Sequence, residues 1–263
     1  MQQNRIYSKV ALDMFSVQLI WSLWFIGFVL LAQIVMVIIS INTGNNIGDF
    51  ILFSHGSTKI YMLVIGIISS YGFLTFYVNH GITRKDYFIG TAIAALGIAI
   101  ALAVIATVIT ALEYGLIEWF NIPVSVDKTV TENVINSSDN SITIMLPKAI
   151  VSSSILVHSS SWIVSLLMYI LNTLTYYVIG WFIGVGYYKY GWVIGFGFIA
   201  SSLVFLITGD LLWGTELGEP LSNWFAFQSV NLPLWGSFVG SIILIALILV
   251  LIRALTREIS IKM

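Results

Sequence analysis

The stretch Phe88–Leu112 reads FIGTAIAALGIAIALAVIATVITAL and contains no charged side chain. A helix needs roughly 20 consecutive apolar residues to cross a bilayer hydrocarbon core of about 30 Å. The stretch is long enough. It also lacks the alternation of polar and apolar positions, over segments of about ten residues, that marks a strand of a membrane β-barrel. It therefore predicts a transmembrane helix and places the chain among all-α membrane proteins.

Five other stretches have the same character: Val17–Ile41, Ile60–Val78, Trp162–Phe182, Trp192–Leu212 and Leu234–Ile252. Of the 263 residues, 59% are hydrophobic and 9% are charged. Soluble domains carry about 25% charged residues, so this composition cannot cover a soluble surface. The sequence thus predicts a single transmembrane domain over residues 1–263, with six spans.

Composition and motifs exclude several classes of function. The net charge of -1 excludes a nucleic-acid partner, because no basic surface is present to neutralise phosphates. The absence of cysteine excludes disulfides and thiolate metal sites. The sequence contains no Walker-type phosphate loop, no HExxH motif and no pair of histidines with metal-ligand spacing. We therefore expect no metal, no cofactor and no catalytic residue in this chain.

Basic residues indicate the orientation in the membrane. Eight flank one side of the predicted spans: Arg5, Lys9, Arg84, Lys85, Lys189, Arg253, Arg257 and Lys262. Three flank the other side: Lys59, Lys128 and Lys148. Because loops rich in Lys and Arg stay in the cytoplasm, both termini and the loops 79–87 and 183–191 are predicted to be cytoplasmic.

Two segments outside the spans have a helical pattern of their own. Residues 4–16 place Arg5, Lys9 and Asp13 on one face and apolar side chains on the other, which favours an amphipathic helix in the membrane interface. The alternative is a cytoplasmic extension of the first span. Residues 213–233 are too polar to span, and we expect a short external re-entrant helix there, between spans five and six.

Ionisable residues are predicted to lie outside the middle of the membrane. Glu113 and Asp210 fall at the external ends of spans, and His55, His80 and His158 fall in or near predicted loops. Intramembrane acids and bases usually mark ion or proton relays. This distribution therefore argues against ion-coupled transport and leaves the histidines as solvated or interfacial residues.

Small residues at helical spacing predict close helix contacts. They are the pairs Gly180–Gly184, Gly191–Gly195 and Gly236–Gly240, and the row Gly90, Ala94, Gly97 and Ala101. We interpret each as packing within one subunit rather than as a dimer face. The polar run at 172–177 has two open interpretations, as the lining of a pathway or as hydrogen bonds between helices.

The most specific short element is NHGITRKDYF at residues 79–88. Gly81 permits a sharp exit from one helix. Thr83 is placed to cap the next helix, with Asp86 three residues later as in a capping box. From the residues alone, this stretch is either a functional contact or a basic turn that only satisfies topology.

The stretch resembles the permease subunits of type-2 ATP-binding-cassette transporters, especially those of Gram-positive bacteria. They often carry Gly-x-Ser/Thr-Arg-Lys/Arg-x-aromatic in this loop, as Gly81, Thr83, Arg84, Lys85, Tyr87 and Phe88 do here. Elsewhere the likeness is one of architecture. The external loop 113–161 is longer than in simple members of the family, so the resemblance carries no substrate.

The resemblance implies a site and partners. The residues Gly81, Thr83, Arg84, Lys85, Asp86, Tyr87 and Phe88 would form a coupling helix that docks on a separate ATPase subunit, which holds ATP and magnesium. Tyr188 and Lys189 would form a second, smaller contact. The first and fifth spans would line the interface with a second permease, identical or a sister chain. That interface points to Gln18, Ser22, Gly195, Ser201 and Ser202 as pathway or dimer-face residues, unless they only bond helices within one subunit.

The function expected on this basis is that of a permease subunit in the plasma membrane of a bacterium. It would export a hydrophobic or amphipathic molecule, such as a peptide, an antibiotic or a lipid-linked glycan, at the expense of ATP hydrolysed by the partner. The alternatives are an energy-independent membrane binding or immunity protein and, with less support, a membrane-embedded enzyme.

Overall fold

The computed structural model describes residues 6–43, 48–120, 162–213 and 233–257, and these ranges are helical without any strand. The helices are α1 (Ile6–Thr43), α2 (Phe50–Ile68), α3 (Leu74–Asn79), α4 (Arg84–Trp119), α8 (Trp162–Tyr190), α9 (Trp192–Leu212) and α11 (Leu234–Arg257). A π-helical segment, Ser69–Phe73, joins α2 to α3 without a break. The predicted external loop 113–161 began too early, since α4 continues to Trp119. The rest of that loop, residues 121–161, and residues 214–232 of the predicted re-entrant segment lie outside the described residues.

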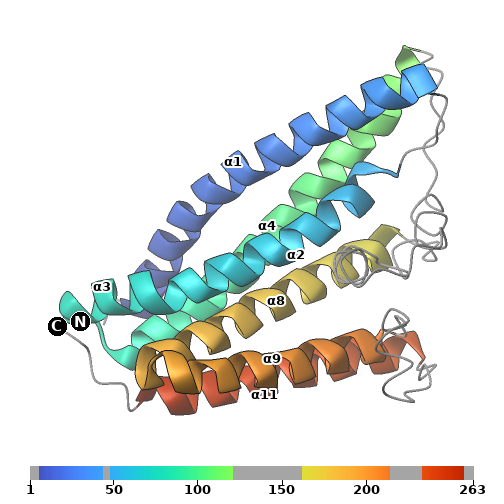
Figure 1. Ribbon diagram of the computed structural model, residues 1–263. Helices are drawn as coiled ribbons and strands as arrows, with labels where there is room; N and C mark the ends of the chain where they lie inside the picture. Colours follow the sequence, from blue (N-terminus) through green and yellow to red (C-terminus); the bar gives the residue numbers. More distant parts are fainter. Residues whose placement is uncertain (1–5, 44–47, 121–161, 214–232, 258–263) are drawn as a thin grey trace.

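The structure confirms an all-α membrane protein with six predicted spans. It contains six helices that are long and apolar enough to cross a bilayer within the described part of the chain. The start of α1 and the end of α11 lie at the same end of the bundle (Figure 1). We call this the termini end and the opposite one the loop end.

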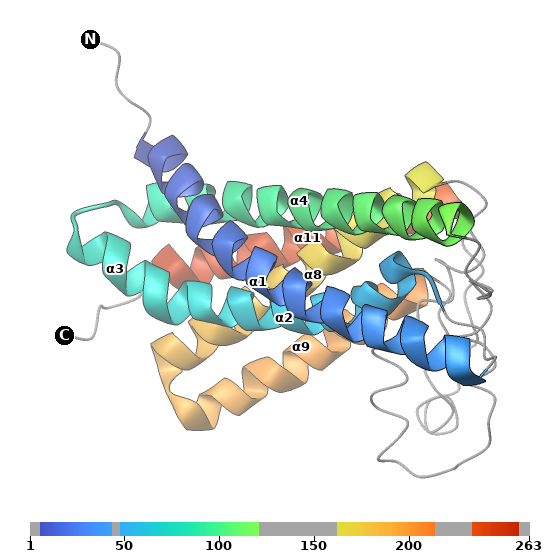
Figure 2. The ribbon, with the colours of Figure 1, turned by 90° about the horizontal axis from the view of Figure 1, so that it is seen from above.

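The amino-terminal segment is continuous with the first span. α1 runs from Ile6 to Thr43 without interruption, and Val10 and Met14 are buried against the bundle. Figure 2 shows α1 crossing the other helices obliquely. Residues 6–16 are therefore continuous with the first span, as in the alternative considered above. Their apolar face packs on protein.

The second span begins ten residues earlier than the apolar run, at Phe50 instead of Ile60. Asp49 caps the helix because its carboxylate accepts a hydrogen bond from the Leu52 amide, at 3.1 Å. Glu113 of α4 accepts a second one from the Phe50 amide, at 2.8 Å. The hydropathy criterion missed this start because the polar residues at 54–59, which follow the apolar first turn, interrupt the apolar run. The prediction that placed Lys59 beside a span was therefore wrong.

The centre of the fold is the pair α2 and α8. α8 is the most buried helix, with 67% of its most apolar window inside the protein. A Cβ atom on Gly180 would lie 2.0 Å from the Leu63 carbonyl oxygen, and one on Gly66 would lie 2.1 Å from that of Tyr177. The two backbones are therefore in direct contact. Gly184 packs on Ser70 in the same way, so this predicted glycine pair serves packing within the chain.

α1 and α4 form the second close pair. A Cβ atom on Gly90 would lie 2.7 Å from the Val10 side chain, and one on Gly97 would lie 3.0 Å from Phe15. Ala94 is buried between them. The row of small residues in the third span thus receives the apolar face of α1, as expected for packing within one subunit.

The orientation is testable with single cysteines, since the chain has no native one. Lys85 is exposed at the termini end and Glu118 is exposed at the loop end. An impermeant thiol reagent added to intact cells is expected to label the Glu118→Cys variant and to label Lys85→Cys only after permeabilisation. Labelling of Lys85→Cys on intact cells would reverse the predicted topology.

Candidate functional site

The predicted coupling element is a sharply folded corner at the termini end. Gly81 has φ of 80°, a left-handed conformation that suits glycine. Thr83 caps α4: its hydroxyl accepts a hydrogen bond from the Asp86 amide at 3.1 Å and donates one to the Asp86 carboxylate at 2.7 Å. The corner is therefore fixed by its own residues, in a variant of the capping box.

The basic residues of this corner have different environments. Lys85 is exposed. Arg84 turns back to α11, where its Nη1 donates to the Arg257 carbonyl oxygen at 2.9 Å. Arg253 donates in return to the Arg84 carbonyl oxygen at 3.3 Å. Two hydrogen bonds thus connect the corner to the end of α11, and Lys85 faces outward.

The two aromatic residues that follow point into the protein. Tyr87 is fully buried and its hydroxyl donates to the Ser69 carbonyl oxygen. Phe88 stacks on Trp181 with ring centroids 5.3 Å apart, and the Arg253 guanidinium lies over the Phe88 ring, 5.6 Å from its centre. These residues anchor the corner to the bundle. The part that a partner can reach is 81–86.

The second predicted contact, at Tyr188 and Lys189, lies at the same end of the bundle. The Tyr188 hydroxyl accepts a hydrogen bond from Thr75, at 3.3 Å. Lys189 lies over the Tyr190 ring, 5.2 Å from its centre. Gly191, with φ of 82°, turns the chain directly into α9. Tyr188 is 9% exposed, so Lys189 presents more of this contact to a partner than Tyr188 does.

The predicted pathway residues of the first span are used inside the chain. The Gln18 side-chain amide donates to the Tyr177 hydroxyl at 3.1 Å and to the Ser69 hydroxyl at 3.2 Å. The Ser22 hydroxyl lies 3.0 Å from that of Tyr61. Gln18 and Ser22 are both fully buried. They bond α1 to α2 and α8, which is the alternative role considered for them.

The predicted residues of the fifth span separate into two groups. Gly195 and Ser202 are buried, and a Cβ atom on Gly195 would lie 2.6 Å from the Tyr187 ring. The Ser202 hydroxyl is buried without a hydrogen-bond partner among the described residues. Ser201, about 100° around the helix from Ser202, is exposed, and its hydroxyl donates to the Gly197 carbonyl oxygen at 2.9 Å. Ser201 is thus the member of this set that faces outward.

Ionisable side chains lie inside the bundle, contrary to the expectation from sequence. His55 is fully buried and Lys59 is 5% exposed, both on α2. Lys59 is nine residues after the start of this helix, or about 14 Å along its axis. Its Nζ lies 5.6 Å from the centre of the Tyr176 ring. The assignment of His55 to a loop was wrong because the helix start at Asp49 was missed. His80 is exposed, as predicted, and His158 is outside the described residues.

A second polar contact, which the sequence did not predict, connects three helices at the loop end. The Gln33 amide of α1 donates to the Glu113 carboxylate at 2.7 Å and to the Gly48 carbonyl oxygen at 3.0 Å. Glu113 in turn receives the Phe50 amide. The residues are too far apart in sequence for any spacing rule to connect them. The available signal was Gln33 itself, a polar residue within a predicted span.

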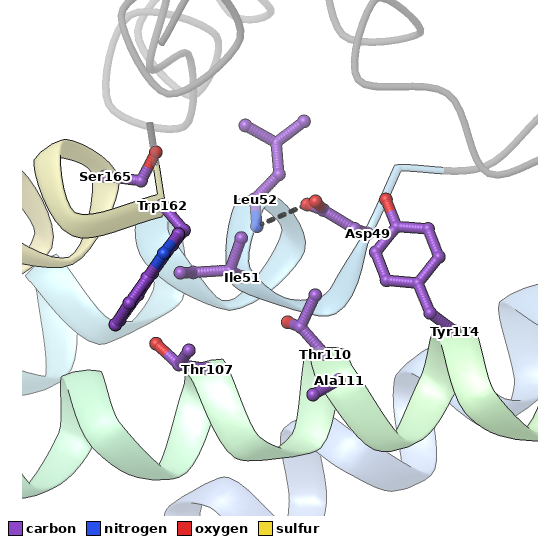
Figure 3. A pocket seen from close by; sticks show the side chains of 9 residues that line it. All are labelled: Asp49, Ile51, Leu52, Thr107, Thr110, Ala111, Tyr114, Trp162 and Ser165. Atoms are coloured by element: carbon purple, nitrogen blue, oxygen red, sulfur yellow. Dashed lines mark hydrogen bonds between the residues drawn. The ribbon is translucent and has the colours of Figure 1, made fainter. Parts of the chain in front are cut away.

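A cavity of about 510 Å³ opens at this end, between α2, α4 and α8 (Figure 3). Its lining consists of Asp49, Ile51, Leu52, Thr107, Thr110, Ala111, Tyr114, Trp162 and Ser165. The rings of Tyr114 and Trp162 stand on opposite sides, and the threonines of α4 form the floor (Figure 3). The volume is typical of a pocket for a small molecule.

No protein-family model, no curated protein and no solved structure matches this chain. Functional inference therefore rests on the termini-end corner, the buried polar residues and the loop-end cavity.

Proposed function

We propose that the chain is the permease subunit of a type-2 ATP-binding-cassette transporter that exports a hydrophobic or amphipathic molecule. The observation that carries the proposal is the corner at 81–86. It combines a glycine turn, a capped helix start and an exposed Lys85, and it is braced from behind by Arg253 and the end of α11. A braced, protruding helix start can transmit force from a partner to the bundle.

In this proposal, a second protein supplies the energy for transport. The sequence has no phosphate loop, so ATP and magnesium belong to an ATPase subunit that docks at the corner. α4 connects the docking site to the loop end over 36 residues, or about 54 Å. Because α4 also contacts α1, α2 and α8, a displacement of its first turn reaches most of the bundle.

A second permease chain completes the transporter. Among the six spans, α9 and α1 have the smallest buried shares of their apolar windows, 11% and 22%. These are the fifth and first spans, the two that the family resemblance assigns to the interface between permeases. Their exposed apolar faces support a dimer, with either an identical or a sister chain.

The docking site is tested by reversing one exposed charge. Lys85→Glu is expected to lower co-purification of the cognate ATPase by about tenfold, since rim charges steer and select partners. Lys9→Glu is the matched control, because Lys9 is also exposed at the termini end but lies outside the corner. The measurement is a pull-down from membranes that contain equal amounts of each variant.

Arg84→Glu is less suitable as the test because Arg84 bonds Arg257 within the chain. Retention of the ATPase by Lys85→Glu at the level of the Lys9→Glu control would exclude the corner as its docking site.

The cavity at the loop end favours a second candidate, an energy-independent binding or immunity protein. Such a protein needs only a site that captures its ligand, and the loop-end cavity of about 510 Å³ could serve as that site. The two candidates differ in one requirement, a separate ATPase. If the chain is a permease, a cell that lacks the cognate ATPase would lose export. If the chain is a binding or immunity protein, the same cell would remain protected against the molecule that the chain binds.

A further inference from the structure

We propose that the helix 50–79 bends at its π-helical segment, Ser69–Phe73, when the corner moves, and that Tyr87 is the positioning residue that holds this joint. Its role in transport rests on the proposed function. The Leu74 amide donates to the Ser69 carbonyl oxygen, five residues back, so this turn contains one residue more than an α-helical turn. Such segments are rare, and they are places where long helices bend.

The side of the joint toward α2 is fixed to α8. Gly66 lies against the Tyr177 backbone, with 2.1 Å between its Cβ position and the carbonyl oxygen. The Ser70 hydroxyl donates to the Trp181 carbonyl oxygen at 3.0 Å, and the Ser69 hydroxyl lies 2.7 Å from that of Tyr177. α2 and the first residues of the joint therefore move together with α8.

The side toward the corner is held less firmly. α3 continues from the joint and turns directly into α4 (Figure 2). Of its six residues, Leu74 and Tyr77 are buried. The Tyr77 hydroxyl donates to the Asp13 carboxylate of α1 at 2.5 Å, and the Thr75 hydroxyl donates to that of Tyr188 at 3.3 Å. With few contacts to break, α3 can follow the corner while α2 stays on α8.

Tyr87 connects the corner to the joint. It is the fourth residue of α4, directly after the corner, and its hydroxyl donates to the Ser69 carbonyl oxygen. The same oxygen accepts the π-helical hydrogen bond from the Leu74 amide. The Tyr87 ring packs against Trp181 and Tyr77, with centroids 6.3 and 6.2 Å away. A displacement of the first turn of α4 therefore acts on the atom that defines the joint.

The first experiment uses the full chain in lipid nanodiscs, without any ATPase. Spin labels are attached to Asn79→Cys at the end of α3 and to Val193→Cys in the first turn of α9, both exposed, and the chain has no native cysteine. Double electron–electron resonance gives the distances between the labels. Tyr87→Phe removes the hydroxyl and keeps the ring. It is expected to raise the population of other distances, relative to the predominant wild-type one, by about two- to tenfold, the effect of one buried hydrogen bond.

Tyr169→Phe is the matched control. Its hydroxyl is also fully buried and donates from α8 to Thr58 of α2, at 2.9 Å, but this bond lies outside the joint. The control is expected to leave the distances unchanged. Equal distributions for Tyr87→Phe and Tyr169→Phe would overturn the proposal.

Deletion of Gly72 tests the joint itself. It removes the residue by which the π-helical turn exceeds an α-helical one, so the helix should continue as an α-helix with α2 and α3 on their present neighbours. The variant is expected to give one narrow distance that Tyr87→Phe no longer changes. A response to Tyr87→Phe as large as in the undeleted chain would contradict the proposal. If the deletion variant does not fold, the comparison of Tyr87→Phe with its control still decides the question.

The role in transport is measured in proteoliposomes with the cognate ATPase. Deletion of Gly72 keeps the corner residues, so the variant is expected to bind the ATPase and to lose transport. Transport at the wild-type rate would show that movement of the corner does not pass through the joint. The distance measurements need no ATPase, and the docking test with Lys85→Glu does not involve the joint. The two proposals therefore fail or stand separately.

Discussion

Replacement of Gly180 by alanine is expected to leave almost no folded protein in the membrane. The added Cβ atom would lie 2.0 Å from the carbonyl oxygen of Leu63 and 2.8 Å from its carbonyl carbon. Both are backbone atoms, so no side-chain rotation can relieve the overlap. α2 and α8 would have to separate along their whole contact, at a cost above the usual 1 to 3 kcal/mol of overpacking.

The matched control is Gly27→Ala. Gly27 lies on the exposed face of α1, where a Cβ atom would have nothing within 4 Å. The two variants make the same chemical change in a membrane helix and differ only in their surroundings. The yield of monodisperse protein after mild detergent extraction, and its thermal midpoint followed by tryptophan fluorescence, measure the difference. A normal yield and midpoint for Gly180→Ala would show that α2 and α8 are not in backbone contact.

The all-helical class and the existence of six spans were predictable because apolar length is a local property. Five predicted spans lie within single described helices, and Trp192–Leu212 coincides with α9. The sixth, Ile60–Val78, runs through α2, the π-helical segment and α3, which follow one another without a break. The role of Gly180 and Gly184 was predictable for the same reason, since two glycines four residues apart lie on one face of a helix. What they would pack against was not.

The start of α2 could not be located from hydropathy. Its first turns contain Ser54, His55 and Lys59, which lower the apolar average, and its capping carboxylates come partly from α4, at Glu113. The network around Gln18 and Tyr177 joins residues 159 positions apart. A sequence gives the chemistry of such residues but not which of them meet, because the meeting depends on how the helices are packed.

The corner at 81–86 has features that were predictable from the sequence and others that were not. The turn at Gly81 and the cap at Thr83 follow from local preferences and agree with the prediction. The inward direction of Tyr87 depends on Ser69, which lies on another helix segment. It follows that a short motif can identify a helix start while leaving open which of its side chains a partner can touch.

The interface proposed for the fifth span leads to an expected difference between two adjacent serines. Ser201 is exposed and Ser202 is 2% exposed. If α9 lines the interface between two permeases, Ser201→Trp places a large ring between the chains. It is then expected to abolish transport while the subunit still inserts and retains its ATPase, because the corner at 81–86 lies in a different part of the chain.

Ser202→Trp is expected to act differently, since its indole must enter the packed contact of α9 with the bundle. Such overpacking should lower the yield of folded protein and, with it, ATPase binding. Transport in proteoliposomes, normalised to the amount of assembled complex, separates a lost pathway from a lost fold. Normal transport by Ser201→Trp would mean that this face of α9 contacts only lipid, because a lipid boundary accommodates a tryptophan that a protein interface cannot. The interface between permeases would then have to be formed by α1 without α9.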